Sequence, residues 1–341
     1  MTYEEMKNCR ICPRECGADR TETKNRFGQG VCKTGENLLI ARAALHFWEE
    51  PCISGTRGSG AVFFSGCNLG CIYCQNAAIS GLNQNRFGIE VTEERLSSIM
   101  LRLQNVEHAN NINLVTGTHF IPQIAQALRI AKKSGLSIPV VWNTSGYEKV
   151  SSLKELEGLV DVWLPDFKYL SADSAKAYSH ASDYPARVKE ALAEMVRQTG
   201  GKLEFYPEPS SDSEKEQNFA QDSASPAGGV KKNVYEGSLS LIKKGVIVRH
   251  LLLPGHVKEA RAVVQYLHET YKDQIILSLM NQYTPMESMK DHPLLGRKVT
   301  KREYERLVDY AIETGVNYGY TQEGSAASES FIPSWNGEGA G

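Results

Sequence analysis

Three cysteines lie on one short loop at a spacing that suits an iron–sulfur cluster. Cys67, Cys71 and Cys74 follow a C-x3-C-x2-C pattern directly after the apolar run 61–65. A 4Fe–4S cluster takes four thiolates, so these three, called the loop thiols below, would leave one iron open to a small molecule. A zinc site that borrows a fourth ligand is the alternative, but structural zinc loops usually pair cysteines as C-x2-C. The spacing therefore predicts a catalytic 4Fe–4S cluster with the loop thiols as its ligands.

A second group of cysteines lies close to the N-terminus. These residues, called the N-terminal thiols below, are Cys9, Cys12, Cys16 and Cys32. Residues 1–44 are polar and too short to build a core, so a metal is expected to hold this segment together. Four thiolates form a complete set for either structural zinc or a second iron–sulfur cluster. Cys52 is left over, either as a replacement ligand for Cys32 or as an unreactive packed thiol.

Composition narrows the class of protein. The chain has 341 residues, 41% of them hydrophobic, which is enough for one large domain or two smaller ones. A formal net charge of −2 argues against a nucleic-acid-binding surface dominated by basic residues. No signal segment and no run of roughly 20 apolar residues is visible, so we expect a cytoplasmic protein without a membrane partner. All eight cysteines fall at or before residue 74, which indicates metal binding in a reducing, anaerobic or facultative host.

Apolar patterns predict alternating strands and helices. Strand-like runs lie at 61–66, 112–116, 138–143, 160–168, 246–253 and 275–280. Helical spacing of apolar residues appears at 92–106, 121–133, 184–198, 257–271 and 300–315. Strand and helix in alternation imply parallel strands joined by right-handed crossovers, whose carboxyl ends collect reactive groups. The fold class is therefore α/β, an open partial (β/α)6 barrel, because an eight-unit barrel needs about 250 residues.

The domain organisation follows from these patterns. We expect a cysteine-rich metal-binding segment at 1–44, a core at 45–285, and a C-terminal helical extension and tail at 286–341. Residues 207–232 are rich in Ser, Asp, Glu, Pro and Gly, which predicts a disordered insertion. The segments 202–206 and 234–237 flank it as arms of a hairpin. The final residues 337–341 are expected to fray.

The cysteine loop, with Tyr73 beside the last cysteine, resembles the cluster motif of radical S-adenosylmethionine enzymes. Residues 45–280 are similar to the pyruvate formate-lyase activating enzyme group, especially its branch with an N-terminal cysteine cluster. The blocks that support this are 143–147 (NTSGY), 161–168 (DVWLPDFK) and 246–255 (VIVRHLLLPG). Auxiliary clusters in related activases favour a second iron–sulfur cluster over zinc at the N-terminal thiols.

The resemblance implies a reaction and its partners. S-adenosylmethionine would bind the open iron and be cleaved by one electron to methionine and a 5′-deoxyadenosyl radical, which takes hydrogen from a substrate. The implied substrate is a glycine of a glycyl radical enzyme, and the implied reductant is flavodoxin- or ferredoxin-like. Radical modification of another peptide or a small molecule is a second hypothesis, since fold does not fix substrate. A non-catalytic zinc or electron-carrier protein is the hypothesis from another class.

The resemblance also assigns cofactor-binding residues. Tyr73 and Asn76 match positions against the adenosine, and the pair Asp166 and Lys168 matches one near the methionine end. Two residues apart on a strand, that acid and base point to the same face. Arg249 matches a family arginine, and a guanidinium can bind a carboxylate at two points. A salt bridge or structural packing is the alternative for each of these residues.

Two departures from the family pattern fall at strand ends. Where many members have Gly-Gly-Glu to bind the amino group, this chain has residues 114–119, LVTGTH, without a carboxylate. Thr116 and Thr118 offer hydroxyl and carbonyl oxygens to the ammonium instead. Asn143 replaces an aspartate associated with a monovalent cation, which counts against that cation here. His119 is expected to be a structural hydrogen-bonding residue.

Overall fold

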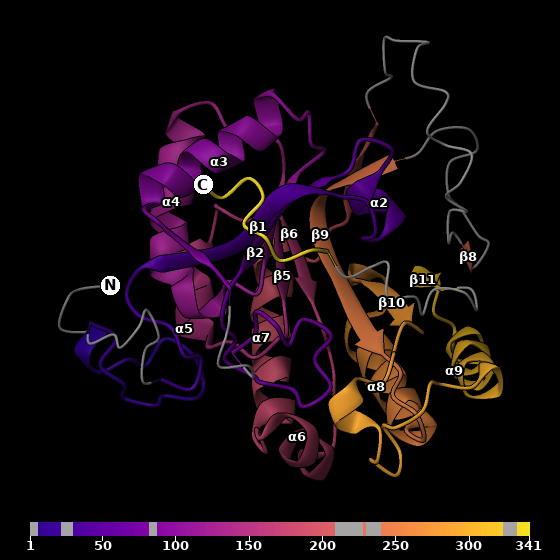
Figure 1. Cartoon of the computed structure of the whole chain (residues 1–341). Coiled ribbons are helices and arrows are strands. Elements are labelled where there is room, and N and C mark those ends of the chain that lie inside the picture. The colour runs from indigo at the N-terminus through magenta and orange to yellow at the C-terminus, as the bar shows by residue number, and fades with distance from the viewer. Residues whose placement is uncertain (1–5, 22–29, 82–86, 209–227, 230–239, 323–332) are drawn as a thin grey trace.

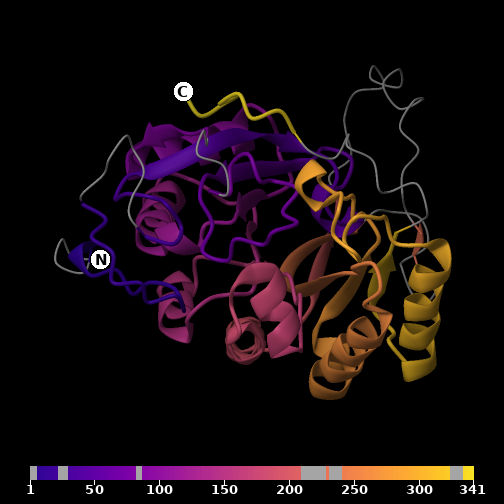
Figure 2. The ribbon, with the colours of Figure 1, turned by 60° about the horizontal axis from the view of Figure 1, so that its bottom comes forward.

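The computed structural model describes residues 6–21, 30–81, 87–208, 228–229, 240–322 and 333–341. Its strands form one sheet of eleven, in the order β3-β1-β2-β4-β5-β6-β9-β10-β11-β8, with β7 paired to β9 beside this path. Helices lie in an arc along the outer face of the sheet (Figures 1 and 2). The predicted α/β class with a mostly parallel sheet is confirmed.

All six predicted parallel strands are present. They are β2 (Ser59–Phe64), β4 (Ile112–Val115), β5 (Val140–Thr144), β6 (Val162–Pro165), β9 (Ser240–Leu251) and β10 (Ile276–Met280). Each pairs in parallel with the next in this list. Their side chains are almost all buried, as expected for strands covered on both faces.

Additional strands extend the sheet at both edges. At one edge, β1 (Leu38–His46) runs antiparallel to β2, and β3 (Ile89–Val91) runs antiparallel to β1. At the other, β11 (Gly319–Thr321) runs parallel to β10 and pairs with β8 (Gly228–Gly229). The C-terminal extension therefore supplies a parallel strand as well as the predicted helix. The domain boundaries themselves stay a prediction.

The predicted helices are confirmed within one or two residues at each end. They are α3 (Glu93–Asn105), α4 (Ile121–Lys133), α7 (Tyr184–Thr199), α8 (Val257–Tyr271) and α9 (Lys301–Thr314). Thr92 caps α3 through the amide of Arg95, and Thr300 and Glu303 form a reciprocal capping box at α9. Short helices α2 (Pro51–Ser54), α5 (Val150–Leu153) and α6 (Ala172–Ser179) and 3-10 turns at Thr118–Phe120, Lys154–Leu156, Lys272–Gln274 and Glu287–Met289 complete the described elements.

Three apolar clusters of described residues hold the sheet. The largest lies between the sheet and its outer helices and includes Trp142 and Trp163. A second lies on the inner face, where Cys52 and Ile53 of α2 pack against Val141, Leu164 and other strand residues, and a third includes Phe63 of β2. Burial raises the pKa of the Cys52 thiol to about 12. Cys52 is therefore a packed thiol, the second of its two predicted roles.

The N-terminal segment packs against the loops at the carboxyl ends of the strands, near α5 (Figure 1). Arg20, which is 1% exposed, donates hydrogen bonds to the carbonyls of Gly35 and His119. The Ser152 hydroxyl of α5 donates to the Ile11 carbonyl at 2.6 Å. Backbone carbonyls and a few polar side chains thus attach a segment that has little apolar surface.

Two expectations about loops need correction. β7 (Glu204–Pro207) does form a hairpin arm, but its described partner is residues 240–244 of β9. The expected arm 234–237 and most of the insertion 207–232 lie outside the described residues. The fraying expected at 337–341 is wrong: Gly337 and Glu338 exchange backbone hydrogen bonds with Ala41 and Ala43 of β1, and Ala340 is buried.

No described helix has both the length and the apolar character needed to cross a bilayer.

Candidate active site

The loop thiols lie where β2 ends, at the carboxyl edge of the parallel strands. Cys71 is buried, and Cys67 and Cys74 are half-buried. Burial raises the pKa of both Cys67 and Cys74, to about 12 for Cys74, and the neighbouring loop thiols raise each further. The loop thiols therefore lie close enough to influence one another's ionisation.

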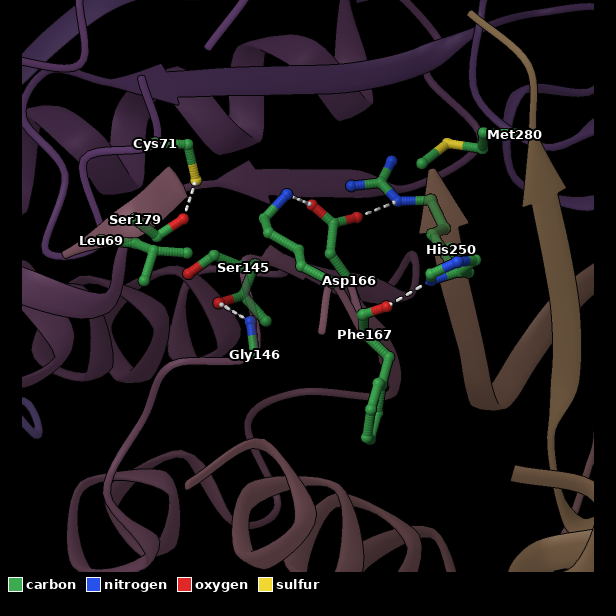
Figure 3. Close-up of polar contacts among 12 residues, drawn as sticks. Leu69, Cys71, Ser145, Gly146, Asp166, Phe167, Ser179, His250 and Met280 are labelled. Carbon is green, nitrogen blue, oxygen red and sulfur yellow. Dashed lines mark hydrogen bonds and ion pairs between the residues drawn. The ribbon is translucent and has the colours of Figure 1, made fainter. Parts of the chain in front are cut away.

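Buried hydroxyl groups form a hydrogen-bonded chain that ends on a loop thiol. The Ser179 hydroxyl donates to Cys71 Sγ at 3.0 Å (Figure 3). Ser179 Oγ also lies 2.9 Å from the Tyr169 hydroxyl, which lies 2.6 Å from that of Tyr73. A hydrogen bond to a ligating sulfur withdraws negative charge and tunes the reduction potential of a cluster.

Charged and amide side chains from β5, β9, the residues after β6 and the connection between β1 and α2 meet near the loop thiols. This charged cluster comprises Glu49, Asn143, Asp166, Lys168 and Arg249. Asp166 accepts from Lys168 Nζ at 2.8 Å and from Arg249 Nε at 3.0 Å (Figure 3). Arg249 also donates to Glu49 Oε2 at 3.1 Å and to Asn143 Oδ1. The predicted residues of β5, β6 and β9 are thus brought together at one edge.

Ionisation in the charged cluster is set by mutual pairing. Burial alone would raise the pKa of Asp166, but Lys168 and Arg249 outweigh it and hold that pKa below its usual value. Burial alone would lower the pKa of Lys168, but Asp166 and then Cys71 and Cys74 raise it. Lys168 therefore stays a cation close to the loop thiols, where it can attract an anionic ligand group.

A tyrosine and a glycine position the ends of β5 and β6. The buried Tyr184 hydroxyl lies 2.8 Å from the Ser145 carbonyl and 2.9 Å from that of Asp166, and it accepts from the Lys168 amide at 3.0 Å. Gly146 has a φ of +76°, and a Cβ there would lie 2.6 Å from the Asp166 carbonyl oxygen. Only glycine permits this close approach of the two strand ends.

A carboxylate that the linear pattern did not show lies at the end of β4 and β5. Glu148 Oε1 accepts from the Thr118 hydroxyl at 2.8 Å and from the Thr144 hydroxyl. Glu148 Oε2 is buried without a hydrogen-bond partner, and burial raises the pKa of this carboxyl group. Thr116 has a φ of +60°, unusual for a β-branched residue and typical of strained functional positions. A buried carboxylate therefore lies beside Thr118, although residues 114–119 contain none.

The remaining predicted residues lie near the loop but outside the charged cluster. Tyr73 is buried and packs edge-on against Tyr178 and Tyr283. The Asn76 carbonyl accepts from the amides of Ile79 and Ser80, so its backbone forms a turn. The assignment of Tyr73 and Asn76 to the adenosine stays a prediction. His119 Nε2 lies 2.9 Å from the Ser65 carbonyl, which agrees with a structural role.

The N-terminal thiols are also gathered. Burial raises the pKa of Cys12 to about 12, and Cys32, Cys9 and Cys16 all contribute to the rise. A Cβ at Gly30 would lie 3.4 Å from Cys16 Sγ and 3.7 Å from Cys32 Sγ, so these two sulfurs share one small space. As they stand, no three Cys, His, Asp or Glu side chains within the described ranges are set to hold a metal ion. The chemistry of the donor groups nonetheless fits a metal. The four N-terminal thiols form a complete ligand set for zinc or for an iron–sulfur cluster, and the three loop thiols would leave one iron of a 4Fe–4S cluster open.

Sequence reasoning missed the residues that reach the site from outside the strand ends. Glu49 comes from the connection between β1 and α2, which no apolar periodicity marked. Ser179 and Tyr169 act through hydrogen bonds between distant segments. The sole sequence signal for Glu148 was a carboxylate directly after the block 143–147.

The sequence matches one family model and one relative. A family model described as "Radical SAM superfamily" matches residues 61–201. The chain is 24% identical over 310 residues to "Uncharacterized protein MJ0674" of Methanocaldococcus jannaschii, covering 90% of this chain and 75% of that protein. No function comes from that relative's description.

Two solved structures align with much of the chain at low sequence identity. Methylornithine synthase (PylB) superposes with a TM-score of 0.46 at 10% identity, over 83% of this chain and 75% of that one. Streptococcus suis SuiB bound to S-adenosylmethionine gives a TM-score of 0.45 at 13% identity, over 75% of this chain and 48% of SuiB. The family match indicates a radical S-adenosylmethionine domain over residues 61–201, and such a domain implies radical chemistry with a 4Fe–4S cluster and S-adenosylmethionine.

Proposed function

We propose that the protein abstracts hydrogen from a glycine of a partner protein, as activases of glycyl radical enzymes do. The observation that supports a bound S-adenosylmethionine is the meeting of Asn143, Asp166, Lys168 and Arg249 beside the loop thiols. The glycine substrate rests on the resemblance to the activating enzymes. A flavodoxin- or ferredoxin-like protein would supply the electron.

The chain's own residues would bind the ligand and exclude water. When bound and reduced, the cluster supplies the electron that cleaves S-adenosylmethionine to methionine and a 5′-deoxyadenosyl radical. Lys168 and Arg249 offer positive charge to a carboxylate, and Asp166 and Glu148 offer acceptors to an ammonium group. Buried tyrosines around Cys71 keep water from the reacting groups.

The first test is the formation of 5′-deoxyadenosine by anaerobically reconstituted, reduced protein supplied with S-adenosylmethionine. We expect product from the native protein and none from Cys71→Ala. A native protein with a fully loaded cluster that forms no product, with or without candidate substrates, would contradict the proposal and favour an electron carrier.

The second test identifies the hydrogen donor. A glycyl radical enzyme of the same host, prepared with deuterated glycine, should transfer deuterium into 5′-deoxyadenosine and gain an organic radical signal in electron paramagnetic resonance. Cleavage without deuterium transfer would reject the glycine substrate but leave radical cleavage in place.

One observation favours a second candidate, a small polar substrate. Glu49 forms a largely buried ion pair with Arg249, 3.1 Å between Oε2 and Nη1, beside the pair of Asp166 with Lys168. A glycine loop presents neutral amides, whereas this surface offers charges that suit a charged small molecule. A charged small molecule that protects Arg249 from chemical modification by an arginine-specific reagent, and that also speeds 5′-deoxyadenosine formation, would favour this candidate over the first.

A further inference from the structure

Arg14 binds two segments that are distant in sequence. It lies between Cys12 and Cys16, inside the group of N-terminal thiols. Its Nε donates to the Asn68 carbonyl at 2.9 Å, and its Nη2 to the Leu69 carbonyl at 2.8 Å. These carbonyls belong to the loop between Cys67 and Cys71.

The same guanidinium also binds the end of α6. Nη2 donates to the Ser179 carbonyl at 2.8 Å, and Nη1 donates to the His180 carbonyl. The guanidinium carbon lies 5.3 Å from the centre of the Tyr147 ring. Four carbonyls and an aromatic face therefore fix this one side chain, whose planar geometry suits such multiple contacts.

The segment that Arg14 binds also contains the donor to Cys71. Ser179 presents its carbonyl to Arg14 and its hydroxyl to Cys71 Sγ. The Cys71 loop and its hydrogen-bond donor are thus both held by a residue of the N-terminal segment.

The segment around Arg14 also contacts α5 and the residue before it: Lys149 pairs with Glu15 and donates to the Arg10 carbonyl, and Ser152 donates to the Ile11 carbonyl. The segment's described backbone closes on itself through the pairs Cys9 with Ala18 and Gly17, and Glu15 with Cys12. Segments of this size without a core depend on a metal for a fixed conformation.

We propose that Arg14 is a positioning residue that couples the N-terminal thiols to the catalytic cluster. This inference rests on the proposed function, because it concerns the cluster at the loop thiols. A metal shared by the N-terminal thiols fixes the turn between Cys12 and Cys16, and Arg14 then holds Ser179 so that its hydroxyl donates to Cys71 Sγ. Loss of the metal or of Arg14 weakens this hydrogen bond and makes the reduction potential of the catalytic cluster more negative.

The test measures that potential in the full chain by redox titration followed by electron paramagnetic resonance. The catalytic cluster is recognised as the signal that changes when S-adenosylmethionine is added. We expect Arg14→Gln and Ser179→Ala to shift the potential to more negative values, with iron and sulfide contents equal to those of the native protein. Arg10→Gln is the matched control, since Arg10 is an exposed arginine of the same segment, and it should cause no shift.

Two further variants separate coupling from simple packing. The double variant Arg14→Gln with Ser179→Ala should shift the potential no further than Ser179→Ala alone, because both act on one hydrogen bond. Cys9→Ser, which removes one N-terminal thiol, should reproduce the shift of Arg14→Gln. An unchanged potential in Arg14→Gln, additive shifts in the double variant, or an unchanged potential in Cys9→Ser would each overturn the coupling.

Failure of the proposed function would look different. A native protein that shows no signal responsive to S-adenosylmethionine would overturn the proposed function, and the coupling with it. A responsive native signal whose potential is the same in every variant would overturn the coupling alone.

Discussion

The two groups of cysteines are held in opposite ways. The loop thiols follow a fully buried strand and lie among buried tyrosines and a serine that donates to Cys71. The N-terminal thiols lie in a polar segment that contacts the rest of the protein mainly through Arg14, Arg20, the ion pair of Glu15 with Lys149 and a few backbone carbonyls. The folded core therefore fixes the first group, whereas we propose that the second group depends on a metal to hold its surroundings.

Each metal is consequently expected to act in a different way. At the loop thiols, a metal would add chemistry to a site that packing has already formed. At the N-terminal thiols, it would add structure, and through Arg14 it would influence the site. Variants of the loop thiols should therefore lose the reaction, whereas variants of the N-terminal thiols should lose local order.

The largest effect is expected from removing a loop thiol. Cys74→Ala should abolish 5′-deoxyadenosine formation and the signal of the catalytic cluster, because two thiolates are too few to retain it. The thermal unfolding temperature should change little. Cys52→Ala is the matched thiol control, because Cys52 packs in the inner core, and it should retain the reaction. Collapse of the fold in Cys74→Ala would mean that the cluster, rather than the core, holds this loop.

Breaking the charged cluster should have the next largest effect, a loss of stability. Asp166→Asn leaves Lys168 and Arg249 without their shared carboxylate, which should lower the free energy of unfolding by about 3 kcal/mol. Chemical denaturation measures this change. Glu305→Gln breaks an exposed pair with Lys301 on α9 and should cost less than about 0.5 kcal/mol. Equal costs for the two variants would show that the charged cluster is no better coupled than a surface pair.

A smaller effect, dependent on pH, is expected at Glu148. Its pKa in the folded protein is raised above the ordinary 4.5 by burial, so the stability that it contributes is present below pH 4.5 and lost as the pH rises through the folded value. Glu148→Gln does not ionise and should avoid this loss. As the pH rises above 4.5, the unfolding free energy of Glu148→Gln should therefore increase relative to that of the native protein, by at most about 1.4 kcal/mol per pH unit. A difference that is constant from about pH 4 to about pH 8 would show that Glu148 is not buried as an acid.

The smallest effect on the barrel is expected from the N-terminal thiols. Cys16→Ser, or treatment with a chelator, should make residues 6–21 accessible to protease while the main thermal transition stays in place. Limited proteolysis followed by mass spectrometry measures this. A lowered transition of the whole protein would instead mean that the segment is part of the core.

The residues at the strand ends could be predicted from sequence because parallel strands place their carboxyl ends at one edge. This rule is sufficient to group Asn143, Asp166, Lys168 and Arg249. Glu49 could not be placed in this way, since its position depends on an antiparallel strand whose register no local pattern encodes. Ser179 could not be predicted either, because its contact with Cys71 joins residues more than a hundred positions apart in the sequence.

The tail that runs beside β1 has a consequence for how copies of this protein meet. Beyond its short pairing with β3, the outer edge of β1 would present free amides and carbonyls, which invite another strand to add. Gly337 and Glu338 already occupy the backbone groups of Ala41 and Ala43. Residues 337 and 338 thereby cover this part of the β1 edge, so its backbone groups are not open to a strand from a neighbouring molecule.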